Sequence, residues 1–319
     1  MTILWILLSI IGVQLALALT LIATQRPVKN LRGAGLDFQR LPKPPPEMPT
    51  QTYTARDGTK LPLRHFPCQN APLLILVHGS GWHGAQFAAL GAKLAKDGLA
   101  EVLVPDLRGH GAAPPTKRGD IAYFNQLEGD LADLAKAYNT GQNLILLGHS
   151  SGGGLVIRAA NGALKGQMAK AILLAPYLKH NAPTARADSA WAAPLTRRII
   201  GLSMLNMMRI RLLNGLTAIQ FRFPNTVLNG PLGHTATRAY SYRMMLGFNP
   251  RAAYLKDISA LPDFTLIAGT EDEAFHAEHY EKTMRAASDK GRFHLLKGLG
   301  HLDVVDAPET YALIKAALA

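Results

Sequence analysis

The chain has 319 residues, of which 48% are apolar and 18% charged, a composition typical of a globular protein with a sizeable core. Its net charge is +12, but the basic residues are dispersed and match no recognition helix, zinc-finger spacing or aromatic RNA-binding motif, so we do not expect nucleic acid as a partner. The single cysteine, Cys68, excludes an intramolecular disulfide and is interpreted as an ordinary loop or core residue.

The first segment, residues 2–24, is almost entirely apolar and contains no charge. About 20 such residues are enough to span a bilayer as a helix, so residues 3–23 are predicted to form a single-pass membrane anchor. A signal peptide usually opens with basic residues, which are missing here, but Ala16-x-Ala18 leaves cleavage and a secreted or periplasmic protein as the alternative. The nearby basic residues all follow the span, and the positive-inside rule then predicts that the rest of the chain is cytoplasmic. They are Arg26, Lys29, Arg32, Arg40 and Lys43.

Residues 25–50 are predicted to be a proline-rich tether. The run Pro42–Pro49 favours extended polyproline II and cannot join a helix or an inner strand. After it, residues 50–56 and 61–66 are expected to pair as a hairpin, because Asp57-Gly58 between them is a strong turn signal.

Beyond the hairpin, strands and helices alternate. Strands are expected near 73–77, 101–104, 143–147, 170–175, 264–268 and 292–296. Helices are expected near 84–97, 121–138, 152–161, 275–287 and 307–318. Fully apolar strands in such an alternation predict an α/β fold with a mostly parallel sheet and helices on both faces. Residues 51–176 and 252–319 would form this core.

The alternation stops in the block 177–251. This block holds five methionines and many arginines, in segments such as 197–213 and 240–245, with few acidic residues. One interpretation is a pair of helices that pack their apolar faces onto the core. Another, compatible with the first, is a lipophilic lid, since methionine-rich surfaces adapt to flexible apolar ligands. A basic amphipathic helix could also lie on an anionic membrane surface.

The central motif is Gly148-x-Ser150-x-Gly152, which follows the apolar run 144–147 and precedes a helix-compatible segment. A serine on a sharp strand-to-helix turn has strained backbone geometry, and side chains at the two flanking positions would collide, so glycine is required there. Such a turn presents the serine hydroxyl beside the N–H groups of the following helix. The motif alone is common, so its interpretation as a nucleophile turn depends on whether the partner residues are also present.

Those partners are present in a fixed order. An apolar strand near 264–268 ends in Gly269-x-x-Asp272, and a later strand is followed by Gly300-His301. Upstream lie His78-Gly79-Ser80-Gly81-Trp82 and the loop Asp106-x-Arg-Gly-His-Gly111. Together these motifs resemble the α/β-hydrolase fold superfamily, in its serine esterase and lipase branch, similar to monoacylglycerol lipases and lysophospholipases. The resemblance covers roughly residues 50–319 and implies that the block 177–251 is a helical cap or lid.

The resemblance implies a catalytic triad of Ser150, Asp272 and His301. Ser150 would attack an acyl carbonyl, and His301 would remove its proton because a serine hydroxyl does not ionise at neutral pH. Asp272 would fix the tautomer of His301. The neighbouring Glu271 and Glu273 leave the choice of acid partly open.

The resemblance also places an oxyanion hole at the backbone N–H groups of Ser80 and Ser151, with Gly81 as the substitute for Ser80. Gly81, Trp82 and His149 are candidates for the substrate pocket. His78 and His110 are interpreted as structural residues that bond to the backbone.

The expected function is hydrolysis of a carboxylic ester through an acyl-enzyme, with a lipid-like substrate such as a monoacylglycerol or lysophospholipid. A thioesterase, amidase, acyltransferase or cofactor-free haloperoxidase of the same fold is an alternative, because all share the triad. A binding member of the fold without activity is the alternative from another class. No cofactor or metal is expected, since His110, His149 and His301 lack the spacing of metal ligands.

Overall fold

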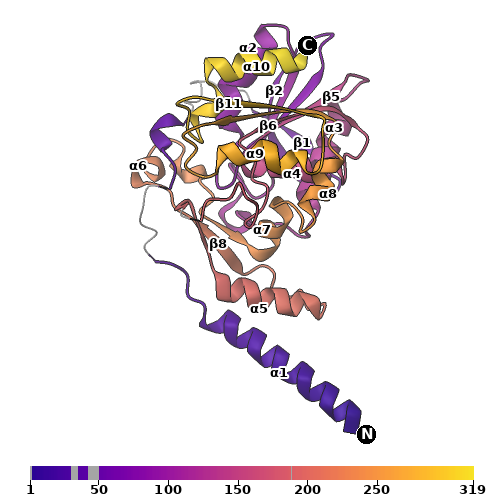
Figure 1. The fold of residues 1–319 in the computed structure, drawn as a ribbon, viewed down its shortest axis with the longest axis vertical. Helices are drawn as coiled ribbons and strands as arrows, with labels where there is room; N and C mark the ends of the chain where they lie inside the picture. Colours follow the sequence, from indigo (N-terminus) through magenta and orange to yellow (C-terminus); the bar gives the residue numbers. More distant parts are fainter. Residues whose placement is uncertain (1, 30–34, 42–49, 188) are drawn as a thin grey trace.

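The computed structural model describes residues 2–29, 35–41, 50–187 and 189–319. Its centre is an eight-stranded sheet in the order β1-β2-β4-β3-β5-β6-β10-β11 (Figure 1). The strands are β1 (Gln51–Thr54), β2 (Lys60–Phe66), β3 (Leu73–Val77), β4 (Glu101–Pro105), β5 (Leu144–His149), β6 (Met168–Leu174), β10 (Asp263–Gly269) and β11 (Gly291–Leu296). The β1–β2 and β2–β4 pairs are antiparallel, and all later pairs are parallel.

Helices cover both faces of this sheet, as predicted. In Figure 1, α2 and α10 lie on one side, and α3, α4, α8 and α9 lie on the other. They are α2 (Ala88–Lys96), α3 (Gln126–Tyr138), α4 (Ser151–Ala160), α8 (Tyr254–Ser259), α9 (Tyr280–Arg285) and α10 (Pro308–Leu318). Because both faces are covered, a central strand such as β3 is buried along its whole length, which explains its unbroken apolar sequence.

The order of the strands determines where a site can form. The chain passes from β3 to β4 on one side and then returns to place β5 on the other side of β3. In open α/β sheets, ligands bind where the strand order reverses in this way, beyond the carboxyl ends of the strands. Here those ends carry the turn after Val77 and the turn after His149, so the two glycine-rich motifs meet at the switch point.

The block 177–251 differs in part from the prediction of a helical insertion. Helices α5 (Thr196–Met207) and α7 (Tyr242–Phe248) correspond to the two methionine-rich segments, and α6 (Asn225–Leu228) is a short turn of helix. The block also contains a three-stranded antiparallel sheet, which was not predicted. It consists of β7 (Ala192–Pro194), β8 (Thr217–Phe221) and β9 (Ala239–Ser241). These strands have three to five residues, too few to show a reliable alternation.

A buried ionic network fixes the return of this block to the core. Glu128 on α3 accepts hydrogen bonds from Arg158 on α4 and from Arg251, the last residue of the block. Arg158 also donates to the carbonyl oxygens of Leu246 and Asn249. The charges of a buried arginine and glutamate are therefore both satisfied, as burial requires.

The first helix, α1 (Thr2–Thr24), projects from the body and lies beside α5 (Figure 1). Most of its apolar side chains are exposed, and it is long and apolar enough to cross a membrane. Only its inner face is covered, where Ala18 and Ile22 pack on Gly201 of α5. The proline-rich run 42–49 lies outside the described residues.

Candidate active site

Ser150 occupies a strained turn between β5 and α4. Its φ is +55° and its ψ is −124°, a conformation that residues with a side chain rarely adopt. A Cβ on Gly148 would lie 2.5 Å from the Gly152 carbonyl oxygen, and one on Gly152 would lie 2.2 Å from the Val77 carbonyl oxygen. Both glycines are therefore required by close backbone contacts, in agreement with the prediction from the motif.

Asp272 and His301 lie on the loops after β10 and β11 and form a buried pair. The Nδ1 atom of His301 is 2.9 Å from Oδ2 of Asp272, and both side chains are at most 2% exposed. The other carboxylate oxygen, Oδ1, accepts the backbone N–H groups of Ala274 and Phe275, each at 2.8 Å. The carboxylate is thus held from one side and directs its second oxygen at the imidazole.

The acidic neighbours of Asp272 have other partners. Glu273 accepts the backbone N–H of His301 at 2.7 Å, and Glu271 forms an ion pair with Arg40 at 3.4 Å. Among the three consecutive acids, Asp272 is the one whose carboxylate contacts the His301 ring. Of the three acids that the sequence offers as partners of His301, the geometry therefore favours Asp272.

Burial and pairing act in opposite directions on this pair. Burial alone would lower the pKa of His301, but the carboxylate of Asp272, assisted by those of Glu273 and Asp303, outweighs it and the pKa is raised. For Asp272, burial favours the neutral acid, while His301 and the two backbone N–H groups outweigh it and lower the pKa. The carboxylate thus stays ionised and favours the tautomer of His301 with its proton on Nδ1.

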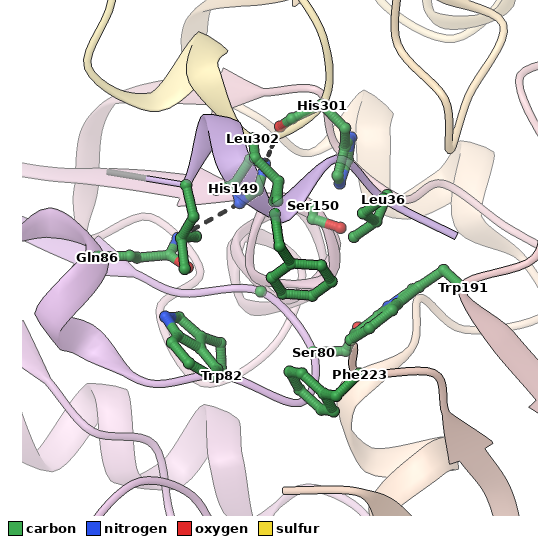
Figure 2. Close-up of a pocket in the computed structure, with 13 residues that line it drawn as sticks. Leu36, Ser80, Trp82, Gln86, His149, Ser150, Trp191, Phe223, His301 and Leu302 are labelled. Carbon is green, nitrogen blue, oxygen red and sulfur yellow. Dashed lines mark hydrogen bonds between the residues drawn. The ribbon is translucent and has the colours of Figure 1, made fainter. Parts of the chain in front are cut away.

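Ser150 and His301 line the same cavity (Figure 2). Both are described residues, and no hydrogen bond joins the Ser150 hydroxyl to the imidazole. Such bonds are often long in unliganded enzymes and shorten when a substrate binds. The arrangement leaves Nε2 of His301 available on the side of the cavity.

The predicted oxyanion donors also lie at this point. Ser151 is the first residue of α4, so its N–H has no partner within the helix, and Ser80 lines the cavity. A Cβ on Gly79 would lie only 3.1 Å from Cβ of Ser150, so the turn that carries Ser80 and the turn that carries Ser150 are in close contact. The N–H of Gly81 instead donates to the Tyr240 hydroxyl at 2.6 Å, so it is not available as the substitute donor.

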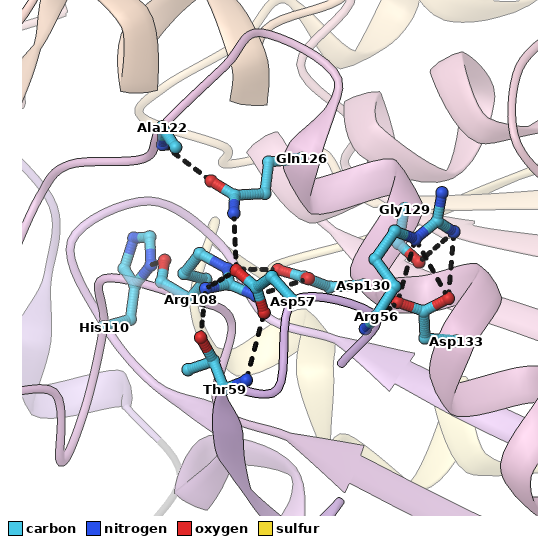
Figure 3. Close-up of polar contacts among 10 residues, drawn as sticks. All are labelled: Arg56, Asp57, Thr59, Arg108, His110, Ala122, Gln126, Gly129, Asp130 and Asp133. Carbon is cyan, nitrogen blue, oxygen red and sulfur yellow. Dashed lines mark hydrogen bonds and ion pairs between the residues drawn. The ribbon is translucent and has the colours of Figure 1, made fainter. Parts of the chain in front are cut away.

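The loop Asp106–Gly111 supports this arrangement through polar contacts, several of which are drawn in Figure 3. None of its residues lines the cavity. Arg108 donates two hydrogen bonds to Asp130, each at 2.8 Å, and further bonds to Asp57 and Thr59. His110 donates from Nδ1 to the Arg108 carbonyl and accepts the Tyr240 hydroxyl at Nε2. Because the same hydroxyl accepts the N–H of Gly81, this loop fixes the turn that carries Ser80.

Two further histidines are held neutral. Burial lowers the pKa of His78 to about 4 and that of His149 to about 3. His78 accepts the N–H of Leu107, which agrees with the structural interpretation of this residue. His149 donates from Nε2 to the backbone carbonyl of His301 at 2.8 Å, and its ring lies 4.7 Å from the His301 ring. His149 therefore supports the loop of His301 as well as lining the cavity.

The cavity at Ser150 has a mainly apolar lining (Figure 2). Of the three residues predicted from the sequence to line a substrate pocket, Trp82 and His149 line this cavity and Gly81 does not. The remaining large apolar side chains were not predicted: Leu36, Phe38, Leu41, Trp191, Phe223 and Leu302. Trp191 and Phe223 come from the block 177–251, where aromatic residues beside short strands indicate a binding site only weakly. The sequence of residues 36–41 contains no pattern that indicates one.

One cluster of possible metal ligands is found in the described part of the chain. The ligand atoms of His276, Glu278 and His279 lie within 4.8 Å of one another on a partly exposed turn. None of the three lines the cavity at Ser150. The pair His301–Asp272 needs no metal to set its protonation.

Comparison with solved structures identifies the fold. A soluble variant of the Saccharomyces cerevisiae monoglyceride lipase aligns with a TM-score of 0.62 at 19% identity, over 89% of this chain and 96% of that one. The Paleococcus ferrophilus monoacylglycerol lipase aligns with a TM-score of 0.59 at 20% identity, over 82% and 98%. These similarities show an α/β-hydrolase fold.

Two curated relatives match a shorter stretch. The "Probable protein phosphatase methylesterase 1" of Caenorhabditis elegans is 27% identical over 112 residues, which are 35% of this chain and 31% of the relative. The protein phosphatase methylesterase 1 of Gibberella zeae is 32% identical over 99 residues, 28% of this chain and 24% of the relative. The chain thus spans a third or less of the length of these relatives. The family model described as serine aminopeptidase, S33, matches residues 69–307, and the chain therefore belongs to this family of hydrolases.

Proposed function

We propose that the chain is a serine hydrolase that cleaves carboxylic esters of lipid-like substrates, such as a monoacylglycerol or a lysophospholipid. The observation that carries the proposal is the buried His301–Asp272 pair beside Ser150, whose strained turn is maintained by two obligatory glycines. This arrangement supports the roles of nucleophile for Ser150, base for His301 and orienting acid for Asp272.

In the proposed reaction, Oγ of Ser150 attacks the ester carbonyl while Nε2 of His301 takes the serine proton. The oxyanion that forms accepts hydrogen bonds from the N–H groups of Ser80 and Ser151. His301 then returns the proton to the leaving alkoxide, which departs as an alcohol and leaves the acyl group on Ser150. A water molecule, deprotonated by His301, releases the acid in the same way. Asp272 keeps the imidazole oriented and stabilises its charged form.

The apolar lining supports an acyl chain as the group bound next to Ser150. Trp82, Trp191 and Phe223 form an aromatic wall with ring-centre distances of 4.9 and 5.7 Å. The relatives named above as lipases and methylesterases act on esters, which supports the same bond type here. A thioester, amide or acyl-transfer reaction would use the same triad, and no contact of the cavity favours one of them over the ester.

Labelling with a fluorophosphonate tests this proposal, because the probe reacts only with an activated serine. We expect stoichiometric labelling of the wild type, with fragmentation mass spectrometry placing the phosphonyl group on Ser150. Protein denatured before the probe is added should remain unlabelled. Modification at Ser151 or Ser80, or a folded protein that resists even a small methyl fluorophosphonate, would contradict the proposal.

We also propose that α1 anchors the enzyme in a membrane, with the end of α5 at the lipid surface and the catalytic core on the cytoplasmic side. Met207, the last residue of α5, is 86% exposed, and Leu212 in the turn that follows is 91% exposed. Arg209 and Arg211 lie between them. Apolar tips beside basic residues suit the boundary of an anionic bilayer. The contact between α1 and α5 brings this turn and the anchor to one end of the molecule.

Deletion of residues 1–24 is expected to move the protein from the membrane fraction to the soluble fraction. The truncated protein should still bind weakly to anionic vesicles. Met207→Ser with Leu212→Ser should remove that remaining binding, because both apolar tips are lost. The matched control Tyr123→Ser should leave vesicle binding unchanged, since this exposed residue lies in the loop that precedes α3 in the core. Full retention of the truncated protein in membranes would contradict the anchor, and a shortened mature chain beginning after Ala18 or Ala23 would favour secretion.

A further inference from the structure

Residues 35–41, here called the strap, cross the cavity at Ser150. The strap contains one 3-10 turn, η1 (Phe38–Arg40), and the side chain of Asp37 caps it by accepting the N–H of Gln39. Leu36 is buried and lies beside Ser150 in Figure 2. The backbone is seated closely as well, because a Cβ on Gly35 would lie 2.6 Å from the backbone of Trp191. The strap is therefore packed onto the site and is not a free linker.

Phe38 completes the aromatic wall of the cavity. Its ring centre lies 5.5 Å from Trp191, 5.5 Å from Phe223 and 6.4 Å from Trp82. These three aromatic residues come from the oxyanion turn and from the block 177–251. An aromatic ring from outside both elements thus fills the space between them.

The strap leaves little room beside the nucleophile. The free space in the cavity is about 20 Å³, enough for about one water molecule. Sites for small molecules commonly measure several hundred Å³. On its other side the strap lines an open groove of about 880 Å³, together with residues 223–227 and Glu273. The strap is thus the wall between a small cavity at Ser150 and a larger, more open groove.

Polar contacts hold the strap to the two loops of the catalytic pair. The N–H of Asp37 donates to Glu273, and Arg40 contacts Asp303, Glu271 and the Gly298 carbonyl at 3.2 to 3.4 Å. The Arg40 side chain is 35% exposed, and ion pairs at such exposure contribute little to stability. Leu36 is as buried as Trp82 and Phe223, all three being less than 10% exposed. The regular structure of the strap is a single 3-10 turn, however, whereas Phe223 closely follows the paired strand β8. The strap is therefore held by its apolar side chains and by partly exposed polar contacts, without pairing to a sheet.

We propose that the strap is a gate that occupies the acyl-binding site and is displaced by the acyl chain of the substrate. Leu36 and Phe38 then determine which esters reach Ser150, because a chain must supply enough apolar contact to replace them. The inference rests on the proposed function for the reaction at Ser150. A long acyl chain can replace the apolar contacts of Leu36 and Phe38 and so open the gate. A short acyl chain replaces only a small part of those contacts.

The variant Phe38→Ala tests the gate with p-nitrophenyl esters of two to twelve carbons. Removing the ring lowers the contact that a substrate must replace, so kcat/KM for the acetate and butyrate esters should rise by about tenfold. The laurate ester should change by less than about threefold, since its chain already opens the gate. Arg40→Gln, which loosens the strap without touching the cavity lining, should change the profile in the same direction. The matched control Tyr123→Ala removes an exposed aromatic ring outside the site and should leave the profile unchanged.

Hydrogen exchange of the wild type provides a second readout that requires no variant to fold. Phosphonylation of Ser150 with a dodecyl fluorophosphonate should increase exchange in residues 35–41, whereas a methyl fluorophosphonate should not. An unchanged ester profile in both variants, or equal exchange with the two probes, overturns the gate while labelling still supports the proposed function. If neither probe labels the wild type or either variant, the proposed function fails, and the gate fails with it.

Discussion

Replacement of Ser150 by alanine is expected to lower kcat for ester hydrolysis by about 10⁶-fold, the scale of loss when a serine nucleophile is removed. Without Oγ no acyl-enzyme can form, and the remaining groups can only orient water. The turn itself should survive, because alanine has no larger side chain than serine and the close contacts are those of Gly148 and Gly152. Initial rates with p-nitrophenyl butyrate, together with the melting temperature, measure the two effects separately.

The neighbouring serines provide matched controls for this variant. Ser151→Ala and Ser80→Ala keep the backbone N–H groups that are proposed to bind the oxyanion, so each should retain activity within about tenfold of the wild type. Ser80 Oγ accepts a hydrogen bond of 3.3 Å from Trp191, and its loss should affect binding more than turnover. If Ser150→Ala stayed within tenfold of the wild type, the nucleophile would have to be another residue.

The sequence predicted those parts of the site that depend on short-range constraints. Ser150 could be placed because Gly148 and Gly152 are required by contacts within a few residues of the turn. The six predicted core strands all lie within about two residues of the observed ones, since unbroken apolar runs are the direct consequence of burial on both faces. Asp272 and His301 follow the ends of parallel strands, which meet at one edge of the sheet.

Features that arise from tertiary contacts could not be predicted. Residues 25–50 were expected to be a tether, yet Leu36 and Phe38 pack against side chains more than 40 positions away, and no local pattern marks them. Gly81 was a reasonable oxyanion donor until the structure showed its N–H bound to Tyr240, a residue 159 positions later. The three-stranded sheet in the block 177–251 was missed because its strands gain their stability from one another and from the core, not from their own sequence.

Replacement of Asp272 by asparagine is expected to lower kcat/KM by about 10² to 10⁴-fold at alkaline pH, by analogy with the same change in other triads. The amide has nearly the same shape, but it can present its NH₂ group to Nδ1 of His301 and favour the tautomer with its proton on Nε2. That tautomer cannot accept the proton of Ser150. Glu271→Gln is the matched control, because this carboxylate contacts Arg40 and not the imidazole. A loss in the control as large as in Asp272→Asn would move the acid to Glu271.

The pH dependence separates this role from a merely structural one. His301 acts as a base only when it is unprotonated, and the Asp272 carboxylate raises its pKa above 6.5. Activity of the wild type should therefore fall as the pH decreases through a value above 6.5. In Asp272→Asn the carboxylate is gone while burial of the ring remains, so the pKa falls and the acidic limb moves to lower pH. The two enzymes should then differ less at acidic than at alkaline pH. Parallel profiles with an unshifted limb would mean that Asp272 does not set the protonation of His301.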